Sequence, residues 1–241
     1  MSRMMFTRLA RLALVCVPLV ANAAVVPDRT RVIFEESATS VSVTVSNKNL
    51  QLPFVVQSWI EDANGKKISA PFMVLPPLQR IEPNESSMLR IVKLPETSLP
   101  KDRESVFYLN IREIPPKSEA VNAMQIALQS KIKLFYRPAS VKRERGADLA
   151  QGLNLTIDSV GKQLLIDNPT PFHITVVGLL AGPQQDKMPV ETIMIAPHSG
   201  ARLPMSSLTF SELRVSNMND FGGQTDTLFH CAAEACKAVA P

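Results

Sequence analysis

The sequence predicts an all-β protein built from two immunoglobulin-like sandwiches with a cleft between them. Short runs of alternating apolar and polar residues recur throughout, and this period of two is typical of half-buried strands. Proline is abundant at 19 residues and glycine is sparse at 9, while no stretch keeps the period of a helix. A charged segment at residues 142–148 divides the strands into two groups, and we interpret it as a linker.

The first 23 residues have the pattern of a secretory signal peptide. Three arginines precede an apolar run at residues 12–21, which is too short for a membrane span, and Ala21-Asn22-Ala23 is a small-residue cleavage site. Cleavage would leave 218 of the 241 residues, and it would remove three of 26 basic residues and none of 22 acidic ones, so that the net charge falls from +4 to +1. We therefore expect an exported protein that neither binds nucleic acid nor inserts into a membrane.

The first group of strands is predicted within residues 24–141. Before the longest strand, we expect strands at residues 32–34, 41–45, 54–60, 72–75, 87–92 and 106–111. The dipeptide Asn64-Gly65 follows the third of these and is a strong hairpin signal. About seven strands in this length are typical of an immunoglobulin-like sandwich.

The longest predicted strand covers residues 122–137 and ends before Pro138, which cannot donate to a ladder. In its first half, Met124, Ile126 and Leu128 alternate with polar or small residues, and no charge interrupts the row. A long, uncharged strand is either central in a sheet or an edge kept ready for another chain. The pattern alone leaves both possibilities open.

The second group of strands is predicted within residues 149–241, a length sufficient for a smaller sandwich. We expect its strands at residues 153–157, 163–166, 173–177, 192–195, 203–205, 213–215 and 227–231. Binding sites tend to lie in clefts between domains. The space between the two sandwiches is therefore the first place to look for a site.

Cys231 and Cys236 are the cysteines that remain when Cys16 leaves with the signal peptide. In an oxidising compartment, we expect them to form a structural disulfide that pins the last strand. A redox C-x-x-C pair has two intervening residues, whereas this pair has four. A thiolate metal site is disfavoured because His230 is the one imidazole nearby in sequence.

The chain lacks the residue patterns of catalysis. Its histidines, His173, His198 and His230, are far apart in sequence and have no carboxylate at ligand spacing. No nucleophile elbow, phosphate-binding glycine loop or Cys-His arrangement occurs. We expect no enzyme activity, no metal and no cofactor.

Basic residues lie near the start of the exported chain, at Arg31, and on the longest strand, at Lys131, Lys133 and Arg137. By parity, Lys133 faces away from the apolar side chains of the first half of that strand, unless a bulge intervenes. Taken alone, lysines on strands are usually solvated charges. A binding role for them needs a further argument.

Two stretches of the sequence resemble the periplasmic pilus chaperones. The segment LPKDRESVFYLNIREIPP at residues 99–116 is similar to the signature of that family, and residues 125–138 are similar to its subunit-capping strand. Further similarities occur at residues 28–31, 51–53, 57–61, 76–83, 167–171 and 219–223, and in the cysteine pair. Together they cover nearly all of the chain after the signal peptide.

The resemblance implies a mode of binding and a location in the periplasm. The two domains would be set at an angle, and the long strand would complete a pilus subunit whose immunoglobulin-like fold lacks its final strand. Three side chains would fill the groove of the subunit, and two cations would anchor its C-terminal carboxylate. The groove-filling residues would be Met124, Ile126 and Leu128, and the anchor would be Arg31 and Lys133.

The resemblance also implies a charge network between the domains and a docking surface for an outer-membrane usher. The network would hold the domain angle, because isolated buried charges are costly and must be paired. The network residues would be Glu104, Arg137 and Asp220, and the usher-docking residues would be Pro53, Pro77 and Arg80. Self-association of the free chain through the same edge stays an open possibility.

Two alternatives to a chaperone deserve comparison. An exported structural or adhesive component of the fibre would more often be one domain with an exchangeable N-terminal extension, and the segment starting at Ala24 is too short for that. A metalloenzyme on a sandwich fold would need clustered histidines, which the sequence lacks.

Overall fold

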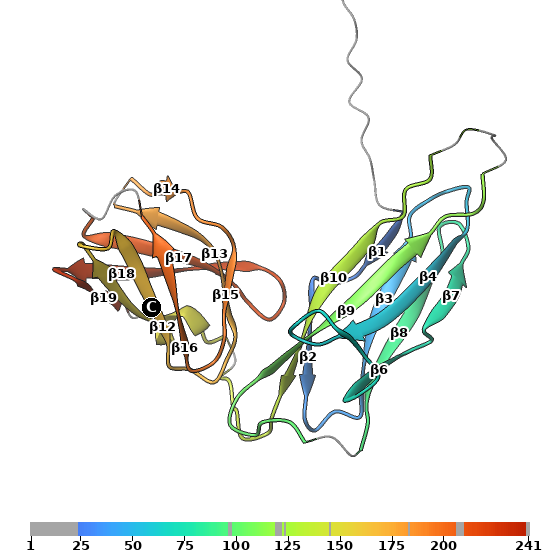
Figure 1. Cartoon of the computed structure of the whole chain (residues 1–241), viewed down its shortest axis with the longest axis horizontal. Helices are drawn as coiled ribbons and strands as arrows, with labels where there is room; N and C mark the ends of the chain where they lie inside the picture. Colours follow the sequence, from blue (N-terminus) through green and yellow to red (C-terminus); the bar gives the residue numbers. More distant parts are fainter. Residues whose placement is uncertain are drawn as a thin grey trace, which may run out of the picture.

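The computed structural model describes residues 24–95, 98–118, 122, 124–144, 146–182, 184–205 and 210–239. These residues form two β domains, each around its own hydrophobic core (Figure 1). The predicted all-β class is confirmed. The predicted signal peptide lies outside the described residues. Within them, no helix has the length and apolar character needed to cross a membrane.

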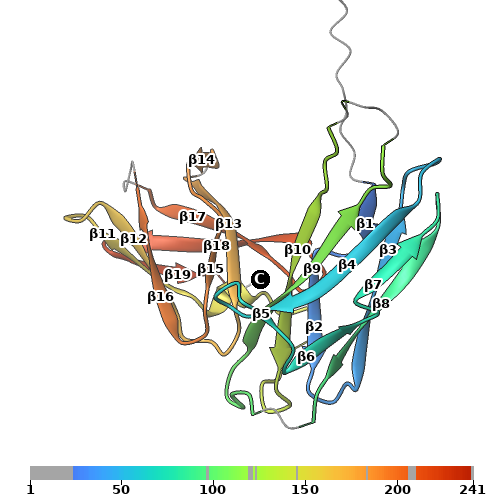
Figure 2. The ribbon, with the colours of Figure 1, turned by 45° about the vertical axis from the view of Figure 1, so that its right-hand side comes forward.

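The first domain consists of two packed sheets. One sheet has the strand order β1-β3-β8-β6, and the other has the order β2-β10-β9-β4-β5 with β7 paired to β4. Figures 1 and 2 agree that β10 and β9 lie on the side of this domain that faces the second domain. The strands are β1 (Val25–Pro27), β2 (Arg31–Glu35), β3 (Ser40–Asn47), β4 (Phe54–Glu61), β5 (Lys67–Ile68), β6 (Phe72–Leu75), β7 (Leu78–Ile81), β8 (Ser86–Lys93), β9 (Ser105–Ile114) and β10 (Gln129–Arg137).

Alternation along the strands places the core of the first domain between its sheets. In β4, every second residue from Phe54 to Ile60 is buried, and the residues between them are half-buried on the opposite face. Phe72 packs centrally, with its ring 5.0 Å from that of Phe34 and 5.1 Å from that of Phe107. Each buried apolar side chain of this size contributes ~1.5–3 kcal/mol. The predicted hairpin is present, since β4 pairs with β5.

The longest strand is shorter than the sequence predicts. The ladder of β10 begins at Gln129, and the expected first part, residues 124–128, is described but forms no strand. The prediction of one continuous strand over residues 122–137 was therefore wrong for its first half.

The partner strand explains why the ladder stops. Strand β9 ends at Ile114, and the two residues that follow, Pro115 and Pro116, have no N–H group to donate. The pairing closes with the N–H of Glu113, which donates to the carbonyl of Leu128 at 3.0 Å. Beyond this bond the apolar segment extends past the end of the sheet.

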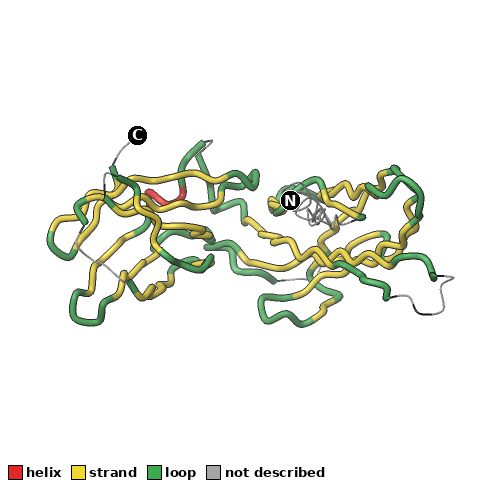
Figure 3. Tube along the Cα trace, turned by 90° about the horizontal axis from the view of Figure 1, so that it is seen from above, coloured by secondary structure: helices red, strands yellow, loops and turns green. Residues whose placement is uncertain are grey.

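The second domain is a sheet that curls around its own core. Its strands pair in the order β14-β13-β17-β18-β19-β11-β12-β16, with β15 also paired to β13. A 3-10 turn, η1 (Leu149–Gly152), precedes them, and Figure 3 shows the two domains side by side along the molecule. The strands are β11 (Asn154–Asp158), β12 (Gln163–Asn168), β13 (Ile174–Ala181), β14 (Asp186–Met188), β15 (Ile193–Ile195), β16 (Ser199–Pro204), β17 (Glu212–Met218), β18 (Gln224–Ala232) and β19 (Ala235–Ala238).

The disulfide between Cys231 and Cys236 is present, as the sequence predicts. The two residues face each other across the β18–β19 hairpin. The bond therefore pins the last strand, which the sequence analysis did not recognise as a strand of its own. The other unpredicted strands, β1, β5, β7 and β14, have only two to four residues, too few for alternation to be visible.

Candidate functional site

The candidate site begins with an incomplete edge of the six-stranded sheet. Strand β10 pairs with β9 from Gln129 to Tyr136, but it pairs with β2 only from Lys133 to Arg137, in parallel. Among the described parts of the chain, residues 129–132 therefore have a strand on one side only. On the N-terminal side of Lys133, the edge of β10 opposite β9 has unpaired backbone groups. Such an edge can pair with a strand of another chain.

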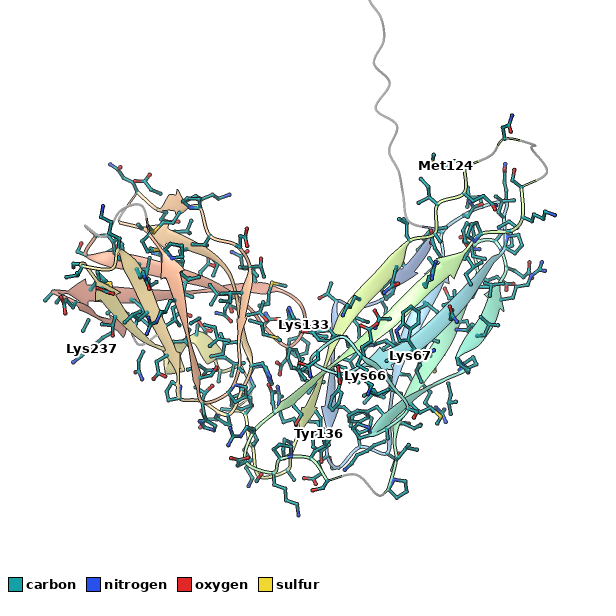
Figure 4. All side chains as sticks on the ribbon, in the orientation of Figure 1. Lys66, Lys67, Met124, Lys133, Tyr136 and Lys237 are labelled. Atoms are coloured by element: carbon teal, nitrogen blue, oxygen red, sulfur yellow. A yellow bond between two sulfur atoms is a disulfide. The ribbon has the colours of Figure 1, made fainter. Side chains whose placement is uncertain are left out.

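Two cations stand where this open edge ends. Lys133 and Arg31 are direct neighbours in the parallel register of β10 and β2. Arg31 is buried, and its Nη1 donates to the carbonyl of Met218 in the second domain at 3.3 Å. Its Nε has no hydrogen-bond partner among the described residues. The influences on the Lys133 ammonium are burial and the charge of Arg31, with no described carboxylate among them. Figure 4 shows Lys133 on the face of β10 that is turned toward the second domain.

The electrostatics of this pair favour an anion. Burial and then the charge of Arg31 lower the pKa of Lys133, because both disfavour the ammonium form. Burial also lowers the pKa of Arg31, and the carboxylate of Asp220 opposes this shift. Two adjacent, partly desolvated cations with unused donors are a ready site for a carboxylate, which only accepts hydrogen bonds.

The three predicted groove-filling residues lie above the open edge. Met124 is 89% exposed, Ile126 66% and Leu128 43%, so they contribute little to the core of this chain. Figure 4 places Met124 at the opposite end of the β10 segment from Tyr136. If the segment became extended in register with β10, strand parity would place them on the face of Ile132. They form an exposed apolar row that begins where the backbone edge begins.

A second lysine on the same face of β10 is neutralised. The Nζ of Lys131 lies 2.7 Å from the Oε2 of Glu61 on β4, and it lies 4.6 Å from the centre of the Tyr108 ring. The other oxygen of Glu61 accepts a hydrogen bond from Trp59 Nε1 at 2.9 Å. The bond from Lys131, and then that from Trp59, lower the pKa of Glu61. The two lysines of β10 therefore differ in their partners.

The predicted network residues Glu104, Arg137 and Asp220 are in contact. Arg137 Nε and Nη2 donate to one oxygen of Glu104 at 2.9 and 2.8 Å, and Arg137 also forms a two-bond pair with Asp220 at 3.0 and 3.3 Å. Glu104 is buried and its second oxygen accepts the N–H of His173 at 2.9 Å. Arg137 and Glu104 belong to the first domain, whereas Asp220 and His173 belong to the second.

Sequence reasoning missed several partners of this network. Arg143, in the predicted linker, forms a second ion pair with Asp220, and Glu35 on β2 lies 3.3 Å from Arg137. Burial raises the pKa of Asp220, but its bonds to Arg137 and the charges of both arginines outweigh burial and lower it overall. Long-range ion pairs carry no local pattern, so the sequence offered no signal for them. Glu61 was missed for the same reason.

A pocket between the domains adjoins the cation pair. Residues from the first and second domains line it together: Asp28, Arg29, Arg31, Ile33, Glu35, Arg137, Asp220 and Phe221. Arg29, at its rim, is bound to its neighbour Asp28 at 2.8 Å. The pocket contains no cluster of ligands for a metal, and no group of three or more such residues occurs in the described ranges.

The predicted usher-docking residues lie on one strand pair of the first domain. Pro53 precedes β4, Pro77 precedes β7 and Arg80 is within β7, which pairs with β4 at that end. Arg80 is exposed and lies 2.7 Å from Glu82. Leu78 beside it is 57% exposed. These residues share a surface that is separate from the open edge of β10.

Comparison with known proteins identifies a family. Residues 24–142 match the family described as "Pili and flagellar-assembly chaperone, PapD N-terminal domain", and residues 149–229 match "Pili assembly chaperone PapD, C-terminal domain". The chain is 44% identical over 219 residues to the chaperone protein PapD of Escherichia coli, which covers 90% of each chain.

Solved structures agree with this result. A chain from the complex of the Salmonella enterica SafA pilin with the SafB chaperone matches with a TM-score of 0.76 and 28% identity, over 88% of this chain and 98% of that chain. The periplasmic chaperone SfaE matches with a TM-score of 0.69 and 30% identity, over 89% of this chain and 100% of that chain.

Proposed function

This chain belongs to the family of PapD-like pilus-assembly chaperones, and we propose that it caps pilus subunits in the periplasm by lending them a strand. One observation carries the proposal. The open edge of β10 ends at Lys133, which lies beside Arg31. The unpaired backbone edge and the anion site are therefore continuous. In the SafA–SafB complex, a chaperone of this fold is found with a pilin.

The position of the cations sets the direction of the added strand. If the C-terminal carboxylate of a subunit binds Arg31 and Lys133, the last strand of the subunit must run alongside residues 129–132 in the same direction as β10. Strand β2 already runs in this direction below the cation pair. The subunit strand would thus continue the row of β2, and backbone bonds to residues 129–132 would supply affinity that does not depend on the subunit sequence.

The apolar row supplies the complementary contact. Met124, Ile126 and Leu128 would enter the groove of a subunit that lacks its final strand, and each would contribute ~1.5–3 kcal/mol once buried. Their exposure in the free chain is the cost of this function, because exposed apolar rows on an edge favour aggregation. Met124 is flexible and suits grooves of different shapes.

The remaining predicted residues would support this role. The network of Glu104, Arg137 and Asp220 would keep the second domain at a fixed angle to the cation pair. The surface with Pro53, Pro77 and Arg80 would dock on the outer-membrane usher that receives the subunit. No chemical step is required, so the chain would act without catalysis and without a cofactor.

The alternative of a fibre component is set aside. Both domains match chaperone domains along the chain, and the relatives named above are chaperones. Family membership therefore supports the chaperone role and not a place within the fibre.

The anchor is tested by co-expressing the chain with a pilus subunit of the same fimbrial system. Lys133→Ala and Arg31→Ala are expected to fold but to yield at least about tenfold less complex, since each loses charge-assisted bonds to the carboxylate. Lys48→Ala, on an exposed loop, is the control. Circular dichroism checks the fold. Wild-type yields from both anchor variants would remove the carboxylate role.

A further inference from the structure

The outer face of β10 carries two lysines, and only one of them is free to bind an anion. Lys131 and Lys133 are two residues apart, so they point to the same side and are separated by about 6.6 Å along the strand. Lys131 is bound to Glu61 at 2.7 Å. Lys133 has no acidic partner among the described residues and stands beside Arg31.

The two arginines near this edge differ in the same way. Arg31 begins β2 and opposes Lys133, whereas Arg29 lies before β2 and is bound to Asp28 at 2.8 Å. Lys131 and Arg29 therefore each have a carboxylate of the chain itself. Lys133 and Arg31 form no ion pair with a described residue.

A strand that pairs along an open edge has a register problem. A slip of one residue would exchange the two faces of the strand, and the apolar row excludes it. A slip of two residues keeps every side chain on its own face, so the apolar pattern discriminates weakly against it. In that slipped register, the subunit carboxylate would lie at the level of Lys131 instead of Lys133.

We propose that Glu61 sets the register of the bound subunit by occupying Lys131. The inference rests on the proposed carboxylate anchor and adds a specificity-determining residue to it. Glu61 is well placed for this role because its side chain is only 13% exposed and is held by Trp59 as well as by Lys131. Lys131 is held in turn by the ring of Tyr108. A carboxylate that slips by two residues meets a lysine whose charge is already balanced, a form of discrimination against a wrong partner position.

The test is a suppressor experiment with the co-expressed subunit. Lys133→Ala should reduce the yield of complex at least about tenfold. Adding Glu61→Gln to Lys133→Ala should restore a measurable part of that yield, because Lys131 then becomes an available anchor. Asp102→Asn, which breaks the exposed pair with Arg103, is the matched control and should restore nothing.

The register itself is read by disulfide trapping. The variant Gln129→Cys is combined with subunits that carry single cysteines along their last strand. With Glu61 present, it should form a disulfide with one of these positions, since a disulfide forms only between closely opposed residues. With Glu61→Gln, a second product should appear whose partner residue lies two positions away. In the Lys133→Ala, Glu61→Gln background, the shifted product should dominate.

Each outcome bears on a different claim. Undiminished complex with Lys133→Ala would overturn the anchor, and the register role with it. Loss of complex with Lys133→Ala, no recovery on adding Glu61→Gln and a single trapped product in every background would leave the anchor in place and overturn the role of Glu61.

Discussion

Arg31 and Lys133, the proposed anchor, illustrate how a binding site can destabilise the fold that carries it. Both are cations, they are adjacent and partly removed from water, and neither forms an ion pair with a described residue. Charges in this position lower the free energy of unfolding of the free chain. The proposed carboxylate partner would account for their placement.

Lys133→Met should therefore stabilise the free chain while it abolishes subunit capture. The methionine keeps an apolar stem and removes the charge, and we expect a gain of a few tenths to about 1 kcal/mol, because partial exposure to solvent screens the ammonium. Thermal unfolding at pH 7 measures it. A loss of stability would show that Lys133 is compensated in the free chain.

The pH dependence of this gain has a definite sign. The folded state lowers the pKa of Lys133, so the unfolded chain binds the proton more readily. The cost of the charge is full below the folded pKa and disappears as pH rises through the usual lysine value of about 10.4. The advantage of Lys133→Met should accordingly shrink as pH rises toward about 10.4 and be absent above it.

At this scale, the sequence indicated candidate residues but not the ion pairs that distinguish them. Resemblance pointed to Arg31 and Lys133, and parity separated Lys133 from the apolar row. Nothing in the sequence distinguished Lys133 from Lys131, because the difference lies in Glu61, which is 70 residues away. Ion pairs between distant strands depend on sheet order, which strand patterns do not determine.

At the scale of elements, β10 combines an ordinary interior strand with an open edge. Its lower half is flanked by β2 and β9, and its upper half by β9 alone. The sequence analysis left a central strand and an edge strand as alternatives, and both describe part of it. The alternation predicted a strand over residues 124–128 that is not present, because the prolines after β9 decide where the ladder ends.

Ile126→Asp tests the apolar row. Ile126 is 66% exposed, so the free energy of unfolding of the variant should lie within about 0.5 kcal/mol of that of the wild type. In a complex, the carboxylate would enter an apolar groove, and we expect an affinity loss of at least about 100-fold. Val160→Asp, at a residue that is 96% exposed in the second domain, is the control. Protection of the co-expressed subunit from degradation is the readout, and full protection by Ile126→Asp would exclude this row as the donor.

At the scale of the whole molecule, one ion network joins the domains. Glu104, just before β9, binds Arg137 and also the backbone N–H of His173, while Asp220 binds Arg137 and Arg143. The same two-domain contact includes the Phe135 and His173 rings at 5.4 Å. Because Arg31 donates to Met218 in the second domain, the domain contact also orients the cation pair.

Asp220→Asn should weaken this contact in a pH-dependent way. At pH 7 we expect a loss of about 1.5–3 kcal/mol, the usual contribution of hydrogen bonds to charged groups. The folded pKa of Asp220 is lowered, so its contribution is present above the unfolded value of about 3.9 and is lost as pH falls through the folded value. Urea midpoints of the two proteins should differ at pH 7, and the difference should shrink progressively as pH falls below about 3.9. A difference that is constant across this range would exclude the carboxylate charge as its origin.

The fold at this scale could be predicted well, and the domain contact only in part: the resemblance indicated Glu104, Arg137 and Asp220, which are in contact. Strand patterns and the charged segment at residues 142–148 indicated two β domains. The second domain nevertheless contains strands too short to detect, and its pairing forms one continuous path. Arg143 was assigned to a linker, yet it pairs with Asp220 and so belongs to the contact that this linker crosses.

Strand β2 occupies the edge of β10 directly after the open residues 129–132, and this limits when a subunit can bind. Because β2 begins at Arg31, a subunit strand paired with residues 129–132 would meet the backbone of β2 directly after the last residue of the subunit. A nascent subunit still attached to the export machinery has no free terminus to place there, and a subunit with an added C-terminal tag would collide with the wall. We therefore expect this chain to bind only subunits whose C-terminus is free, so that capture would follow the release of the complete polypeptide.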